Sequence, residues 1–243
     1  MAKVSETRPV QPFTQVVLRG YGDITLEQGE AERLEVEADE QIMAKIKSEV
    51  RDGRLILGFD LSWWEWVVWW LSWLSIPDKT IRFHVTLRQF DGLALYGSGT
   101  VAAEALRSQQ ASLRLAGAGR VQVGQLTASA LEFGISGSGK VQVGQLEAEA
   151  VSSRISGSGE VVLAGRAGRH QVYISGSGRV RAAELETQET EVSISGSGNV
   201  AVNVKRELKV EISGSGDVTY RGQPQVSQRI SGSGRVRAEG EGR

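Results

Sequence analysis

Cysteine is absent from this chain of 243 residues, and histidine occurs only twice. Without cysteine there can be no disulfide framework and no thiolate metal site. The formal net charge is −1 at pH 7, and the sequence shows no basic stripe interleaved with aromatic residues. Both features argue against a nucleic-acid partner. The first residues, Met1 to Pro9, lack the apolar core of a signal peptide, which favours a cytoplasmic location unless a leader is missing.

The groups that could perform chemistry form no catalytic or metal-binding pattern. His84 lies in an alternating segment and is expected to point outward from a strand, while His170 follows a Gly-Arg turn. Residues 134–140 satisfy the letters G-x-x-x-x-G-K, but Val141 follows where a P-loop needs Ser or Thr. A serine nucleophile would need a base nearby, and none is evident. The sequence therefore predicts no enzyme, no cofactor, no metal site and no nucleotide partner.

Glycine is abundant instead, at 30 residues, and much of it belongs to one repeat. The motif Ile-Ser-Gly-Ser-Gly-x-Val occurs six times between Ile135 and Val236, and relaxed copies begin at Leu95 and Leu115. A weaker echo covers residues 18–24. Successive motifs lie 18 to 20 residues apart, and their glycines are Gly97, Gly99, Gly117, Gly119, Gly137, Gly139, Gly157, Gly159, Gly176, Gly178, Gly196, Gly198, Gly214, Gly216, Gly232 and Gly234.

This period suits one coil of a parallel β-helix, built from three short strands and three turns. The alternation within each unit is that of a strand, so valines such as Val141 and Val143 are expected to face the interior. The isoleucines at 135, 155, 174, 194, 212 and 230 would stack inside. Eight coils about 4.8 Å apart would form a rod roughly 35–40 Å long.

Glycine suits a corner that recurs at every coil, because a Cβ there would collide with the neighbouring coils. The serines beside the glycines are expected to form ladders of hydroxyl hydrogen bonds. The outward position after the corner mixes charges of both signs, which is typical of a solvated ladder with weak pairing. Its residues are Thr100, Arg120, Lys140, Glu160, Arg179, Asn199, Asp217 and Arg235.

The first third of the chain follows a different pattern. Its apolar spacing predicts a helix within 39–50, and Asp52-Gly53 predicts a turn. The expected organisation is a tail at 1–11, a β-rich part at 12–94 with an insertion at 61–76, the solenoid at 95–236, and a polar tail at 237–243. Strands are expected at Val16–Leu26, Leu34–Ala38, Leu55–Phe59 and Ile81–Leu87, the last two as a hairpin with the insertion at its tip.

All six tryptophans fall within eleven residues of that insertion. Ser62 and Glu65 match a capping box and Pro77 a stop, which predicts a short helix over about 63–75. Such a helix is too short to span a bilayer, but it suits the bilayer interface. The predicted contact residues are Leu61, Trp63, Trp64, Trp66, Val67, Trp69, Trp70, Leu71, Trp73, Leu74 and Ile76.

The tryptophans together carry on the order of 1,000 Å² of aromatic surface. Leaving that area in water would cost more than ~20 kcal/mol as an upper bound, which exceeds the whole stability of a typical domain. The segment is therefore expected to meet a membrane, a second copy of the chain, or a groove in the same chain. The first two can combine, since several clustered helices could insert together.

The repeated corners, the early Gly-Tyr-Gly-Asp-Ile segment and the Asp52-Gly53 hairpin resemble the bacterial head GIN domain family of auto-transporter adhesins over about residues 12–236. The resemblance implies a right-handed β-solenoid, no catalytic residues and a tie to the cell envelope. Two features depart from the family pattern, the missing leader and the Trp-rich insertion. They favour attachment through the insertion over a plain secreted adhesin.

The sequence as a whole predicts an all-β, non-catalytic solenoid that self-associates and attaches to a membrane surface through residues 61–76. Lipid and further copies of the chain are the expected partners, and the cytoplasmic face of the membrane is favoured, with the cell surface as the alternative if a leader is missing. The alternative function is an adhesin or envelope-stress sensing module that binds glycan or protein through the solenoid faces.

Overall fold

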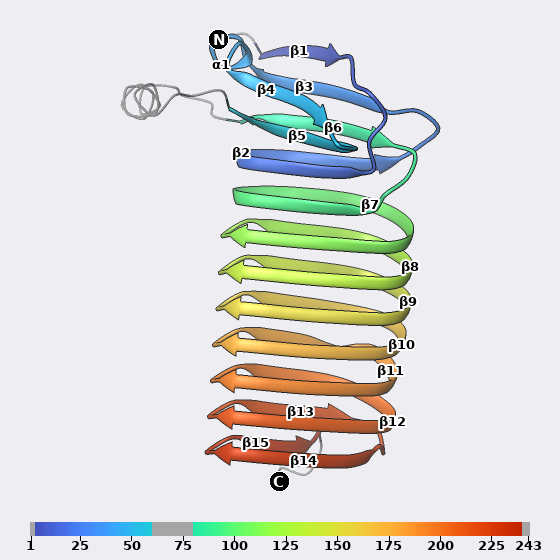
Figure 1. The fold of residues 1–243 in the computed structure, drawn as a ribbon, viewed down its shortest axis with the longest axis vertical. Coiled ribbons are helices and arrows are strands. Elements are labelled where there is room, and N and C mark those ends of the chain that lie inside the picture. Colours follow the sequence, from blue (N-terminus) through green and yellow to red (C-terminus); the bar gives the residue numbers. More distant parts are fainter. Residues whose placement is uncertain (1–2, 60–79, 240–243) are drawn as a thin grey trace.

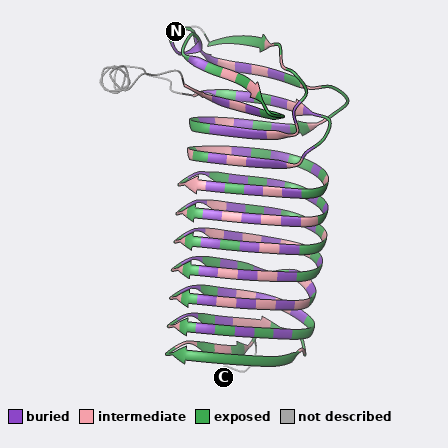
Figure 2. Ribbon diagram, in the orientation of Figure 1, coloured by how far each residue is buried: buried purple, intermediate pink, exposed green. Residues whose placement is uncertain are grey.

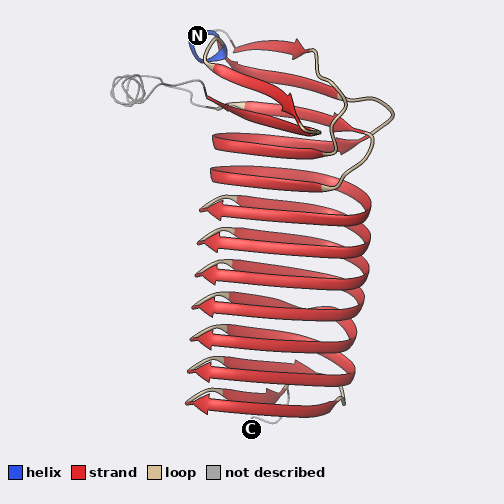
Figure 3. Cartoon of the chain, in the orientation of Figure 1, coloured by secondary structure: helices blue, strands red, loops and turns tan. Residues whose placement is uncertain are grey.

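The chain is a β-solenoid. In the computed structural model, which describes residues 3–59 and 80–239, nearly every element is a strand (Figure 3). The fifteen strands of the described residues form one sheet, and from Gly92 onward the chain winds as stacked parallel coils (Figure 1). Eight glycine corners from Gly97 to Gly232 bound seven complete turns. The predicted all-β solenoid is confirmed.

Each repeat of the sequence forms one coil. From Arg120 to Gly214 each strand begins just after one corner and ends at the first glycine of the next, and aligned repeats pair in register, with Ile155 between Ile135 and Ile174. The coil strands are β2 (Gln15–Gln28), β7 (Gly92–Gly117), β8 (Arg120–Gly137), β9 (Lys140–Gly157), β10 (Glu160–Gly176), β11 (Arg179–Gly196), β12 (Asn199–Gly214), β13 (Asp217–Arg221), β14 (Gln225–Gly232) and β15 (Arg235–Ala238).

Three stretches of alternation make up each coil, as the period predicts. In β8 the phase of the alternation shifts at Gly124 and again at Ser129, and the β8–β9 pairing is interrupted at the same two residues. Two of the three turns are therefore single residues inside one continuous strand, and only the glycine corner separates strands (Figure 2). The buried residues of β8 are Val121, Val123, Leu126, Ala128, Leu131, Phe133 and Ile135.

The corners are close-packed backbone. Gly137 has φ 120°, and a Cβ there would lie 2.6 Å from the carbonyl oxygen of Gly117 on the preceding coil. A Cβ on Gly139 would lie 2.3 Å from the Leu115 side chain, which packs beneath the corner. The Ser138 N–H donates to the Gly117 carbonyl at 3.0 Å. Bonds of this backbone type join the corners within the described residues, in place of the predicted hydroxyl ladder.

The N-terminal end of the solenoid carries an antiparallel cap. Strand β1 (Lys3–Arg8) pairs with β3 (Arg33–Asp39), and β3 pairs with β6 (Arg82–Leu87), which lies on β2. The guanidinium of Arg8 donates to the carbonyls of Ile46 and Met43 and so fixes β1 to the short helix α1 (Glu40–Met43). The structure also contains the predicted strands Val16–Leu26 and Leu34–Ala38, within β2 and β3.

The predicted helix over 39–50 is wrong beyond its first turn. Within residues 39–50 only α1 is helical, with Asp39 as its N-cap, and β4 (Ile46–Arg51) follows. Ile42, Ile46 and Val50 fit a helical spacing, but Ile46, Ser48 and Val50 fit a strand equally well. Strand β4 pairs with β5 (Arg54–Phe59) across the predicted Asp52-Gly53 turn, and this pairing decides between the two.

The predicted hairpin between Leu55–Phe59 and Ile81–Leu87 is also wrong. Strand β5 pairs in parallel with the first part of β2, Gln15–Leu18, and β6 pairs in parallel with the later part, Asp23–Gln28. The two strands are therefore successive parts of one coil rather than the arms of a hairpin. Strand β2 pairs with β5 through its first part and with β6 through its later part, so β5 and β6 do not pair with each other.

The core contains one histidine. His170 lies between Val151 and Thr190 of the neighbouring coils, is fully buried, and has its Nε2 atom 3.0 Å from the Ser153 hydroxyl. Its Nδ1 atom has no hydrogen-bond partner among the described residues. Burial lowers the pKa of His170 to about 4, because the imidazolium would lose its hydration in an apolar core.

Replacing a corner glycine should destabilise the solenoid far more than replacing a glycine on a face. We expect Gly137→Ala to lower the free energy of unfolding by about 2 kcal/mol or more, from positive φ and contact with the coil beside it. Gly134→Ala is the matched control, because its Cβ would meet only the Arg114 Cγ at 3.7 Å. Urea unfolding of both variants provides the measurement, and equal midpoints would contradict a steric role for the corner.

Acid should weaken the fold through His170. Its pKa is depressed in the folded state, so below about pH 6.5 the unfolded chain binds a proton that the folded chain refuses until about pH 4. The stability present at pH 7 is lost over that window, by up to about 3 kcal/mol. The measurement is the change in unfolding free energy between pH 7 and pH 4.5 in the wild type and in His170→Leu. We expect a smaller change in the variant, and identical changes would exclude this histidine as the cause.

Candidate functional site

The Trp-rich segment joins the solenoid at its corner edge. The segment follows Phe59, the last residue of β5, and precedes Thr80, which lies just before β6. On the adjacent coil the matching place is the corner Gly20-Tyr21-Gly22 of β2, which pairs in register with Gly97-Ser98-Gly99. Residues 60–79 thus connect two halves of one coil at a place where other coils have a short glycine corner (Figure 1).

Aromatic side chains surround this attachment point. A Cβ on Gly20 would lie 3.4 Å from the ring of Phe59, and one on Gly22 would lie 2.8 Å from the ring of Phe83. Tyr21, at the centre of that corner, is 38% exposed, whereas later corners carry serine or alanine there. The corner next to the attachment point is therefore the one corner among those described that has a large aromatic side chain at its centre.

A hollow of about 690 Å³ lies beside the same corner. Its lining combines apolar groups with charges of both signs, and includes Arg19, Tyr21, Lys47, Glu49, Ile56 and Phe59. The hollow also reaches the glycines of the next two corners, Gly97 and Gly117. The surface next to the attachment point is thus amphipathic, a character suited to a polar–apolar boundary.

The predicted contact residues of the insertion, Leu61 to Ile76, lie outside the described residues, so the predicted helix stays a prediction. The predicted corner glycines lie in one line along the edge from which β5 and β6 reach the insertion. Of the two histidines, His84 is exposed on β6 as expected, and His170 is in the core. Sequence reasoning missed the core position because Gly168 and Arg169 precede it.

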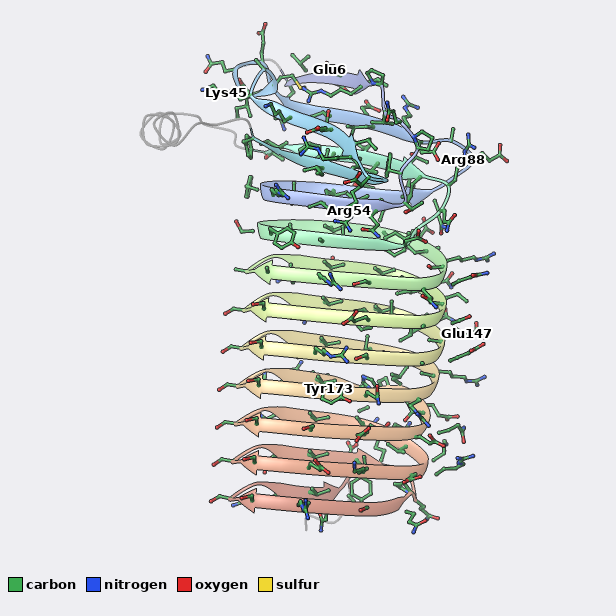
Figure 4. The ribbon with its side chains drawn as sticks, in the orientation of Figure 1. Glu6, Lys45, Arg54, Arg88, Glu147 and Tyr173 are labelled. Carbon is green, nitrogen blue, oxygen red and sulfur yellow. The ribbon has the colours of Figure 1, made fainter. Side chains whose placement is uncertain are left out.

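A second candidate surface is a groove of about 560 Å³ on the broad face of the coils. Short outward side chains form its floor, namely Ala116, Gly134, Ser136, Ser156, Ser175, Ser193 and Ser195. Tyr96, Tyr173, Arg114 and Arg154 line it as well, and Tyr96 is 46% exposed. Figure 4 shows Tyr173 on the broad face, away from Glu147 on the edge opposite the corners.

The two arginines of this groove contact the same carboxylate, and one of them also contacts a tyrosine ring. Glu132 lies 3.1 Å from Arg154 and 3.8 Å from Arg114, and the guanidinium of Arg154 lies 5.1 Å from the centroid of the Tyr173 ring. An arginine held against an aromatic ring keeps both groups in place at low conformational cost. Sequence reasoning missed this cluster, because its members come from four coils. The sequence feature that could have revealed the cluster is the large Arg154 and Tyr173 at a position where neighbouring repeats have Gly134 and Ser193.

Charged ladders occupy the remaining outward positions. Lys140 contacts Glu160 at 3.0 Å, as the alternation of signs after the corner predicts. Arg181, two residues beyond that position on the next coil, contacts Glu160 at 3.1 Å. On another part of the coils, a hydrogen bond from Arg169 lowers the pKa of Glu189 below its usual range. Exposed pairs of this kind contribute about 0–1 kcal/mol each. No cluster of three or more His, Cys, Asp or Glu residues that could hold a metal ion occurs within 3–59 and 80–239.

Comparison with known families decides the classification of this fold. Residues 12–224 match the family model described as "putative auto-transporter adhesin, head GIN domain". The chain belongs to this family. The resemblance inferred from the repeated corners is thereby confirmed, and membership of an adhesin family indicates binding rather than catalysis.

Solved structures share the fold of this head GIN domain protein at low sequence identity. A putative adhesin from Parabacteroides merdae aligns with TM-score 0.87 and 21% identity, over 98% of this chain and 96% of its own. A putative adhesin from Parabacteroides distasonis aligns with TM-score 0.87 and 22% identity, over 98% and 97%. A putative lipid binding protein from the same species aligns with TM-score 0.84 and 21% identity, over 98% and 96%. At these identities the likeness establishes the fold alone.

Curated proteins offer no match to this head GIN domain sequence. The adhesin description of the family associates the fold with the cell surface or the membrane, and it lends no support to the predicted cytoplasmic face. Within the described residues, no helix has the length and apolar character needed to cross a bilayer.

Proposed function

We propose that this head GIN domain protein is a non-catalytic, adhesin-type scaffold that self-associates and attaches to a membrane surface through residues 61–76. The observation that carries the proposal is the position of the insertion. Strand β5 ends at Phe59 and β6 begins at Arg82, both at the corner edge and beside the Tyr21 corner of β2. A segment attached there can reach a flat surface without disturbing any pairing between coils.

The chemistry of the insertion favours the boundary of a lipid bilayer. Tryptophan prefers the headgroup region, where its ring is buried and its N–H remains hydrated. Glu65 is the only charged residue between Leu61 and Ile76, so the attraction is hydrophobic rather than electrostatic. Association of several copies would strengthen attachment, because each further insertion binds from an already bound assembly.

Liposome flotation tests the attachment. We expect the wild type to float with neutral phosphatidylcholine vesicles, and the bound fraction to fall at least tenfold when all six tryptophans are changed to serine. Because the segment lacks basic residues, binding should persist in 1 M NaCl, where exposed charges are screened within about 3 Å. The double variant Tyr96→Ser/Tyr173→Ser is the matched aromatic control and should float normally.

Two results would contradict this role. If the six-Trp variant floated as well as the wild type, the insertion would not be the anchor. If both proteins stayed at the bottom of the gradient and only the variant lost native mass, the tryptophans would form a contact between subunits instead.

The alternative function is recognition of a glycan or protein by the solenoid face, and the broad-face groove favours it. An exposed tyrosine, a second tyrosine braced by arginine, and a floor of small residues suit a flat sugar ring, whose C–H groups pack on aromatic rings. Four of the five coils that contribute to this floor present serine hydroxyls in register, which can donate to and accept from sugar hydroxyls.

A glycan array would test this alternative. We expect any specific glycan signal of the wild type to fall at least tenfold in Tyr96→Ser/Tyr173→Ser and to remain in the six-Trp variant. The reverse pattern, or no signal on any glycan for the wild type, would leave the face without a role in glycan recognition. The two variants thus separate face binding from membrane attachment.

A further inference from the structure

The two ends of the solenoid differ in how they are covered. At the N-terminal end, β1, β3 and α1 lie over the coils and bury residues such as Leu34 and Ile42. At the other end every residue of β14 is exposed (Figure 2). Val226 is 36% and Ile230 38% exposed, whereas the aligned Leu208 of the preceding coil is fully buried. The last coil therefore presents part of the hydrophobic core to solvent.

Strand β14 is also an open hydrogen-bonding edge. It pairs with β12 on one side, and no described strand pairs with its other side. Its eight residues include one charged residue, Arg229, and no proline. Strand β1, which forms the opposite edge of the sheet, is shorter and carries Lys3, Glu6 and Arg8. Charged side chains and short length are the usual protection of an edge strand, and β14 is longer than β1 and carries one charge against three.

From these two features we infer that β14 is the interface between two copies of the chain, which pair their β14 strands antiparallel about a two-fold axis. This inference rests on the self-association in the proposed function and names its surface. Pairing an edge with the same edge of a second copy closes the assembly, whereas pairing β14 with β1 would build an open filament. The charges on β1 oppose the second arrangement.

The side-chain pattern selects one register. With Gln228 on the axis, Val226 faces Ile230 of the partner subunit, and the two glutamine amides can hydrogen-bond to each other. Arg229 then faces the hydroxyl of Ser227. A shift that centres the axis on Arg229 would place two arginines opposite each other, and a shift to Ser227 would leave Ile230 without an apolar mate. Registers centred between residues would pair inward with outward side chains.

The chain contains no cysteine, so an introduced cysteine is the only thiol in a cross-linking test. In the full-length six-Trp→Ser chain, Gln228→Cys on the axis should form an interchain disulfide under mild oxidation. Ser231→Cys is the exposed control. In the inferred register the two copies of residue 231 are about 20 Å apart, beyond the ~7 Å limit for the Cα atoms of a disulfide. We expect at least a tenfold faster cross-link for Gln228→Cys.

A charge-pair test examines the same register without cysteine. The six-Trp→Ser chain, the parent of these variants, should sediment as a dimer at twice its own chain mass. Ile230→Glu should shift the dimer dissociation constant at least tenfold towards monomer, because it places a carboxylate opposite Val226. Adding Val226→Lys should restore the dimer, since each copy then presents a lysine to the glutamate of the other. Circular dichroism of each variant reports whether its coils remain folded.

Three outcomes would overturn the inference, namely a parent chain that stays monomeric at high concentration, open-ended polymers, or equal cross-linking at 228 and 231. None of them bears on membrane attachment, because the tryptophans are absent from this background. Conversely, a wild type that fails to float leaves the dimer measurements valid. The two failures are therefore distinguishable.

Discussion

The fold depends on close, in-register stacking of identical coils. The inward side chains of each coil pack against those of the coils before and after it. A single repeat alone could not bury them. The backbone bond from the Ser138 N–H to the Gly117 carbonyl illustrates how tightly the corners approach. Only glycine permits this approach, since any Cβ at Gly137 or Gly139 would meet the adjoining coil. The regular spacing of glycine along the chain follows from this constraint.

The same constraint determines where the solenoid can accept an insertion. Within a strand, an extra residue must be absorbed by a bulge or irregularity, as between Ala182 and Glu186 where the pairing of β11 with β12 shifts register. At a corner the register of the preceding and following strands is set independently, by Gln15–Leu18 for β5 and by Asp23–Gln28 for β6. Residues 60–79 can therefore interrupt one coil at the corner while both halves keep their partners. This explains why the chain accommodates the Trp-rich segment between β5 and β6, at the corner edge and not within a face.

The repeats made most of the fold predictable, because their alternation and period specify which residues face inward and which pair across coils. Prediction failed where the local pattern fits two structures. Ile42, Ile46 and Val50 suit a helix or a strand, and the pairing of β4 with β5 decides between them. Two strands that flank an insertion look like a hairpin, although both belong to one coil. The core position of His170 and the groove around Tyr173 depend on contacts between coils, which local patterns do not reveal.

A solenoid of this kind concentrates its specificity in the places where it departs from its own repeat. The corner glycines and the apolar inward rows are needed for stacking, so most of their positions keep the pattern of the repeat. The variable features are an aromatic corner at Tyr21, the arginine-braced ring of Tyr173, and a glutamine at position 228 where Val210 precedes it in the same inward row. Each lies at a different place on the rod, the corner edge, the broad face and the open end. A repeat protein can thus place attachment, recognition and assembly at separate sites, because a substitution in one coil alters contacts only with the adjacent coils.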